Sequence, residues 1–171
     1  GGQAATMEMK SVSSNFFELY GVAPAAGRLF KEGVDNENDS APVVLNAVAA
    51  RELGFASAQE AVGQTVMFTG FDNVVTTKRI VGIAPELRFH SLREKPRAVA
   101  YDLSTAGTVL SLRASAAPGD VERAAQALWP SYFPDAIART YRAANVLAVN
   151  YDEDARLARL LAVATGIALA I

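Results

Sequence analysis

The side chains that could do chemistry in this chain are few and scattered. The sequence has no cysteine and a single histidine, His90, so it offers no thiolate nucleophile, no cysteine zinc site and no poly-histidine metal site. Ser91 follows His90, with Asp102 further along, but adjacent residues do not place a nucleophile against its base, and no Gly-x-Ser-x-Gly elbow occurs. We therefore expect no catalytic residue and no enzymatic activity, which disfavours a hydrolase.

An acidic run raises the possibility of a cation site. Asp35, Glu37 and Asp39 alternate like part of a calcium loop, but the twelve-residue pattern, its central glycine and its terminal bidentate glutamate are missing. No Walker sequence and no Gly-x-Gly-x-x-Gly motif is present. We expect a solvated turn here, and a protein that uses no metal and no cofactor.

A basic run offers a candidate contact for a partner. Its cations, offset by two glutamates, are Arg88, Arg93, Lys95 and Arg97. One interpretation is a contact with an acidic protein surface or with lipid headgroups. The other is an ordinary exposed loop, because isolated surface charges contribute little.

The composition is that of a globular chain. It has 171 residues, 51% of them hydrophobic, and a net charge of −2. A weakly acidic chain is a poor match for nucleic acid, whose binding needs clustered cations. The first residues lack the basic and apolar regions of a signal peptide.

Hydrophobic patterning predicts an α+β chain. Strands are expected over residues 6–12, 42–45, 65–69, 74–84, 98–103, 109–114 and 137–142. Helices are expected over residues 14–20, 47–53 and 120–129, with one further turn after residue 57. Ser13, Asn46 and Ser57 are the expected N-caps, and residues 22–30 are expected to be irregular.

The last segment allows two interpretations. Residues 160–171 contain no charged side chain, but as a helix they would reach only about 18 Å, short of the ~30 Å hydrocarbon core. They form either a buried terminal helix or a membrane helix cut by the end of the chain. Their small residues slightly favour the membrane, with residues 150–159 as a polar stem helix leading into it.

Several blocks, in order, resemble one family. They are VSSNFFELYG and GRLF over residues 12–30, VVLN and ARELG over 43–54, AVGQTV over 61–66, IVGIA over 80–84 and RLARLL over 156–161. Together they are similar to the periplasmic core domain of MacB-type permeases, members of the FtsX/MacB family of ABC transporter permeases. Ser14 departs from the usual proline of that pattern, and Ala84 from a common valine.

The resemblance singles out ten structural positions. They are Asn15, Phe16, Phe17, Gly21, Gly27, Arg28, Phe30, Gly54, Gly63 and Gly82. We expect Phe16 and Phe17 to pack in the core, with contact to a cargo as the alternative. Gly27 and Arg28 are expected to fix a turn, in which the arginine bonds a carbonyl or a carboxylate.

The resemblance also implies two small lobes and a stem. Residues 1–106 would form a sabre-like mixed α/β lobe, residues 107–148 the strand–helix–strand half of a porter-like βαβ lobe, and residues 149–171 the stem and the start of a truncated transmembrane helix. Because half a lobe leaves an open sheet edge, we expect the strands at 109–114 and 137–142 to pair with a second copy or with the N-terminal strand.

The implied function is noncatalytic. The domain would lie in the periplasm, at the bacterial inner membrane, and transmit ATP-driven motion to export or to lipoprotein and envelope handling. Its implied partners are the membrane through the C-terminal helix, a cytoplasmic ATPase subunit or domain acting indirectly, and a second copy in a homodimeric transporter. The alternative is a periplasmic small-molecule or peptide sensor, which an enclosed apolar pocket with convergent polar groups would favour.

Overall fold

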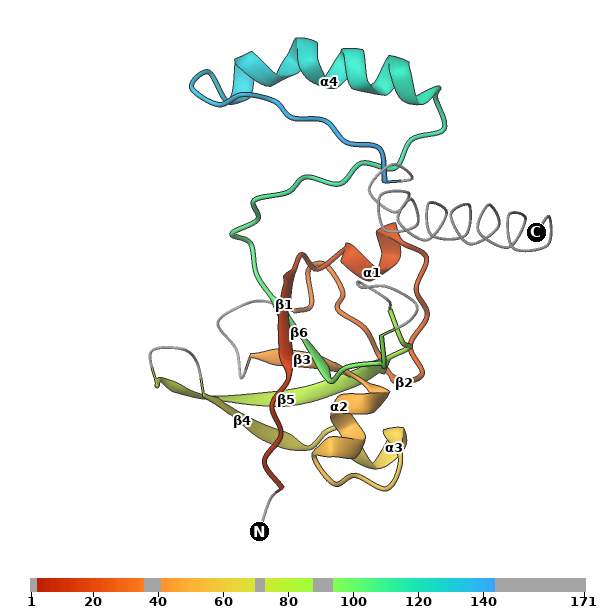
Figure 1. Ribbon diagram of the computed structural model, residues 1–171, viewed down its shortest axis with the longest axis vertical. Helices are drawn as coiled ribbons and strands as arrows, with labels where there is room; N and C mark the ends of the chain where they lie inside the picture. Colours follow the sequence, from red (N-terminus) through yellow and green to blue (C-terminus); the bar gives the residue numbers. More distant parts are fainter. Residues whose placement is uncertain (1–2, 36–40, 70–72, 88–93, 144–171) are drawn as a thin grey trace, which may run out of the picture. The chain divides into compact units, whose positions relative to one another are not determined.

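The computed structural model describes residues 3–35, 41–69, 73–87 and 94–143. The chain divides into two compact units, residues 1–111 and residues 112–171. Among these described residues, the first unit has a β-sheet with three short helices, and the second has one longer helix (Figure 1).

A six-stranded mixed sheet organises the first unit. Its strands are β1 (Glu8–Val12), β2 (Ala26–Gly27), β3 (Pro42–Asn46), β4 (Thr65–Thr69), β5 (Val75–Ala84) and β6 (Val99–Leu103). The order is β1-β6-β3-β5-β2, and β4 also pairs with β5. The pairs β1–β6 and β3–β5 are parallel, and the other pairs are antiparallel. The predicted strands before residue 104 are thus confirmed, with small shifts at their ends.

Central strand β3 is buried along its whole length, as expected for an apolar run covered on both faces. Val43 and Leu45 belong to one core cluster, which α2 (Ala47–Glu52) and α3 (Ala58–Ala61) cover. Val44 belongs to the opposite cluster, into which α1 (Phe16–Leu19) packs Phe17. The helices accordingly lie on the two sides of the sheet (Figure 1), which makes the unit a mixed α/β structure.

Two of the three predicted N-caps are confirmed. The Asn46 side chain accepts a hydrogen bond from the Ala49 amide at the start of α2, and Ser57 accepts one from the Glu60 amide at the start of α3. The prediction for α1 was wrong, because this helix begins at Phe16, with no side-chain hydrogen bond at its cap. The Ser13 hydroxyl instead donates to the side-chain oxygen of Asn15, at 2.7 Å.

The residues expected to be irregular, 22–30, contain the short strand β2, which lies very close to β5. The Arg28 amide donates to the Val81 carbonyl at 3.0 Å, and Gly27 has a φ of +63°. A Cβ added at Gly82 would lie 1.9 Å from the Arg28 carbonyl oxygen. Only glycine at position 82 therefore lets the two backbones approach this closely.

The second unit is built around α4 (Pro118–Tyr132), which is longer than the predicted helix. Pro130 lies inside the last turn of α4, and the helix ends two residues later rather than at the proline. The chain after the helix is fixed to it by the Trp129 indole, which donates to the Ala136 carbonyl at 2.8 Å, and by the Thr140 hydroxyl, which donates to Glu122.

The predicted strands at residues 109–114 and 137–142 are not formed. The prediction of a strand–helix–strand unit was therefore wrong for both strands. An alternating pattern becomes a strand only beside another strand that takes up its backbone hydrogen bonds. Strand β1 does not supply that neighbour: among the described residues its one strand partner is β6.

The predicted stem and membrane segment, residues 149–171, lies outside the described residues. Within the part of the chain that the structure describes, no helix combines the length and the hydropathy required to cross a membrane.

The close approach at Gly82 predicts that Gly82→Ala destabilises the first unit. The added methyl group must push β2 off β5, and overpacking of this kind costs about 1–3 kcal/mol or more. Urea unfolding followed by circular dichroism measures the loss. Gly107→Ala is the matched control, because a Cβ there meets nothing closer than 3.9 Å. Equal stabilities of the two variants would contradict the prediction.

Candidate functional site

The two phenylalanines of the NFFE motif, Phe16 and Phe17, hold α1 against the sheet. The Phe17 side chain is 1% exposed, and its ring lies 5.2 Å from that of Tyr101 and 5.9 Å from that of Phe30. Phe16 is partly buried beside Tyr20 and Tyr101. Phe17 thus belongs to the core, with no surface with which to contact a cargo, and Phe16 packs against that core. Burial also raises the pKa of the Tyr101 hydroxyl above its usual range.

The GRLF motif itself is not a turn: Gly27 ends β2, and Arg28 closes the turn that follows at residues 31–35 through an ion pair. The Arg28 guanidinium donates to both oxygens of Asp35, at 2.5 and 2.7 Å, and to the Leu29 carbonyl. The Lys31 amide donates to the same carboxylate at 2.9 Å. These bonds hold the pKa of the Asp35 carboxyl below its usual range. Asp35 was expected to lie in a solvated turn. Its carboxylate is instead held within the turn by Arg28 and the Lys31 amide.

Asn46 does more than cap α2. Its side-chain oxygen accepts from the amides of Ala49 and Val99, at 2.9 and 3.0 Å. Its amide nitrogen donates to the Arg97 carbonyl at 2.7 Å and to Glu86 at 3.1 Å. The side chain is buried, and all four of its hydrogen bonds are made. The sequence predicted only the cap, since the other partners lie 40 to 53 residues away.

A partly buried ion pair lies where β3 begins. Lys78 of β5 is only 8% exposed, and its ammonium lies 2.7 Å from a carboxylate oxygen of Asp102 on β6. The pair lines a pocket of about 280 Å³, whose walls are Ser11, Ala41, Pro42, Lys78, Asp102, Leu103 and Ser104. Sequence reasoning missed this pocket; the only available signal was a lysine within an otherwise strand-forming run.

The remaining predicted positions are dispersed. Gly21, Gly54 and Gly63 have positive φ values and lie just after α1, α2 and α3. Lys95 is exposed, and Arg97 pairs with its neighbour Glu94 at 2.5 Å. Arg88, Arg93, His90 and Ser91 lie outside the described residues, as do Glu37 and Asp39. The described part of the basic run therefore brings no cluster of cations together.

The described residues also contain no group of three or more histidine, cysteine or acidic side chains that could hold a metal ion. Asp102, the acid of the disfavoured hydrolase arrangement with His90 and Ser91, forms an ion pair with Lys78. What the arrangement offers chemically is hydrogen bonding and ion pairing that hold segments together.

These features define an α/β domain with a mixed sheet and short helices on both faces. The family model of the MacB-like periplasmic core domain matches residues 1–130, and the chain belongs to this family. The expected resemblance is confirmed, and membership makes the chain a periplasmic module of an ABC transporter permease. Comparison with curated proteins and with solved structures found no match.

The four bonds of Asn46 predict that Asn46→Ala costs about 2–4 kcal/mol, because the helix loses its cap and the buried Val99 amide loses its acceptor. Ser57→Ala removes a comparable but exposed cap and should cost about 1 kcal/mol. Urea unfolding of both variants measures the difference. An Asn46→Ala loss no larger than that of Ser57→Ala would show that the long-range bonds add nothing.

The Arg28–Asp35 pair predicts an acid-dependent contribution to stability. The folded pKa of Asp35 is lowered, so its stabilisation is complete above the unfolded value of about 3.9 and is lost as the pH falls through the folded pKa. Asp35→Asn should lower the free energy of unfolding at pH 7 by roughly 1 kcal/mol, since Arg28 is partly exposed. The difference in the free energy of unfolding between Asp35→Asn and wild type should disappear below about pH 4. Urea titrations at several pH values would measure it. Glu32→Gln, at an exposed acid of the same turn, is the control and should show no such convergence.

Proposed function

We propose that this domain is a noncatalytic transmission element, which carries ATP-driven motion of an ABC transporter permease to export or to lipoprotein and envelope handling. The family match over residues 1–130 is the observation that carries the proposal. The bonds within the first unit support it, because an element that transmits motion must not deform under load.

Three features stiffen the first unit. The Asn46 side chain ties β3, α2 and the start of β6 together. The backbones of β2 and β5 meet at Gly82 without room for a side chain. The Arg28–Asp35 pair closes the turn that follows β2. Each feature joins segments that are distant in the sequence or would otherwise move separately, which favours motion as a single body.

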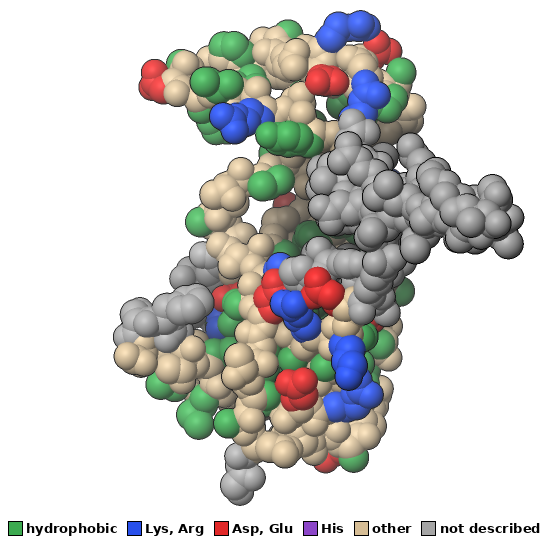
Figure 2. All heavy atoms as spheres, in the orientation of Figure 1, with side chains coloured by type: hydrophobic (Ala, Val, Ile, Leu, Met, Phe, Trp, Pro, Cys, Tyr) green, Lys and Arg blue, Asp and Glu red, His purple; other side chains and the backbone are tan. Residues whose placement is uncertain are grey.

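The proposal includes the assembly around the domain. The domain would be anchored in the bacterial inner membrane through the C-terminal segment, driven indirectly by a cytoplasmic ATPase subunit or domain, and present twice in a homodimeric transporter. The second unit would act as part of a porter-like lobe. Its helix α4 has no buried residue, and hydrophobic side chains lie at the surface of this unit (Figure 2), so it has apolar area available for packing.

The alternative function, a small-molecule or peptide sensor, has weaker support. The pocket beside Lys78 and Asp102 is lined mainly by polar and charged groups, and its two charges already neutralise each other. A sensor of small organic ligands would instead use an enclosed apolar cavity. The transmission role is therefore the better supported one.

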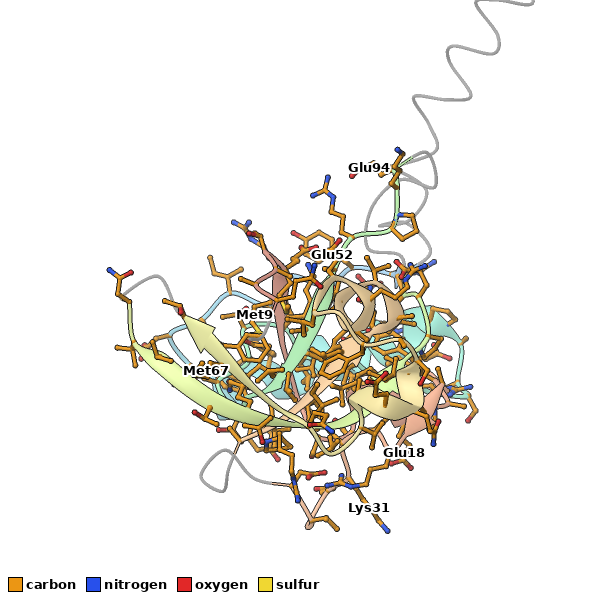
Figure 3. The ribbon with its side chains drawn as sticks, turned by 90° about the horizontal axis from the view of Figure 1, so that it is seen from below. Met9, Glu18, Lys31, Glu52, Met67 and Glu94 are labelled. Carbon is orange, nitrogen blue, oxygen red and sulfur yellow. The ribbon has the colours of Figure 1, made fainter. Side chains whose placement is uncertain are left out.

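Spin-label distances in the assembled, reconstituted transporter test this proposal. Cysteines are placed at Lys31 and Glu52, which are both exposed and labelled in Figure 3. The distance between their two spin labels reports on any change of shape within the first unit. A single label at Glu52 in each copy reports on motion between copies. ATP turnover trapped with vanadate should leave the Lys31–Glu52 distance unchanged and alter the Glu52–Glu52 distance.

Either of two results would contradict the proposal. A change within the first unit would show that it deforms, as a ligand-closing sensor does. No change in either distance would show that ATP hydrolysis does not move the domain.

A further inference from the structure

Strand β4 forms an outer edge of the sheet. It pairs with β5, in a register that runs from Thr65 opposite Arg79 to Thr69 opposite Val75, and no other strand of the described residues pairs with it. Met67, at its centre, is 77% exposed and is labelled in Figure 3. An open edge of this kind can accept another strand.

The orientation of the backbone groups follows from the antiparallel ladder. The Ile80 amide donates to the Gln64 carbonyl at 2.9 Å, toward β4, whereas the Arg79 amide donates to Ala41, away from it. Because the direction alternates along a strand, Val66 and Phe68 direct their N–H and C=O groups to β5. Thr65, Met67 and Thr69 direct theirs outward, away from the sheet.

The strand is also complementary to itself. In an antiparallel pair related by a two-fold axis at Met67, Thr65 faces Thr69 of the second copy, and Met67 faces Met67. Every residue in these pairs directs its backbone groups outward, so about six hydrogen bonds can form in register. Val66 then lies opposite Phe68 on the side that packs against the core cluster. The Thr65–Thr69 and Val66–Phe68 pairings are of favourable types, and no like charges face each other.

Strand β4 differs from β1, at the opposite edge of the sheet, in carrying no charged side chain. Strand β1 carries Glu8 and Lys10, which form an ion pair at 2.6 Å, and charged side chains on an edge discourage pairing with another chain. The β4 sequence TVMFT has no charge and no proline, so two copies can meet without like-charge repulsion or a missing donor.

We propose that β4 is a self-association edge, at which two copies of this domain join their sheets through antiparallel β4–β4 pairing centred on Met67. The inference concerns the contact between domains and stands independently of the transmission role.

Site-specific cross-linking of the full chain tests the pairing, because the natural sequence has no cysteine. In a hydrogen-bonded antiparallel pair the Cβ atoms lie about 5.5 Å apart, which is longer than the about 3.5–4.5 Å of an unstrained disulfide, so a short bifunctional maleimide is used in place of an oxidant. With this reagent, Met67→Cys should form a cross-linked dimer roughly tenfold faster, or more, than a cysteine on an unpaired surface, since pairing raises the effective thiol concentration. Val109→Cys is the matched control, at a position 82% exposed.

The register provides a second test. Thr65→Cys and Thr69→Cys should cross-link when the two variants are mixed and should cross-link poorly when each is alone. Equal rates for Met67→Cys and Val109→Cys would overturn the proposal. So would a Thr65→Cys variant that cross-links alone as fast as in the mixture, because that pattern belongs to another register or to random collision.

A charge exchange at Met67 checks that the pairing also exists without cysteines. Met67→Lys and Met67→Glu should each be monomeric, and an equimolar mixture should associate, as sedimentation at several concentrations would show. The position is exposed, so neither substitution should disturb the fold. Monomers in the mixture, or dimers of Met67→Lys alone, would count against β4 pairing.

Discussion

The buried amide of Asn46 is the interaction on which the rest of the first unit depends. An amide group shut away from water destabilises a fold unless all of its donors and acceptors find partners. Here those partners are the first turn of α2, the start of β6 and the segment before it. Satisfying this one side chain therefore specifies where β3 ends, where its helix begins and how β6 lies beside it.

Two further contacts extend this arrangement across the sheet. Glycine at position 82 leaves no side chain between β5 and the backbone at Arg28, so β2 can lie directly against β5. The Arg28–Asp35 pair then holds the following turn closed. Phe17 packs against Phe30, which precedes that turn, and against Tyr101. The family positions NFFE, GR and IVG are therefore linked through packing, which explains why residues far apart in the sequence serve one structural purpose.

The two units differ in how completely they bury their apolar residues. The first has a core on each face of its sheet, whereas α4 in the second buries none of its side chains. A unit that leaves Leu128, Tyr132 and Phe133 exposed gains little from the hydrophobic effect on its own. The proposed transmission role makes use of this contrast, because it assigns the well-packed first unit the part of a rigid body and leaves the apolar surface of the second free for packing.

The sequence by itself determined the features that depend on near neighbours. These are the strands with clear apolar patterns, the caps at Asn46 and Ser57, the glycines after the short helices and the family. Tertiary structure alone decided the long-range bonds of Asn46, the Lys78–Asp102 pair, the approach of β2 to β5, and the absence of strands at 109–114 and 137–142. The physical reason is that capping and periodicity are local, while a ladder, an ion pair between strands or a close backbone contact exists only when a distant segment arrives beside it.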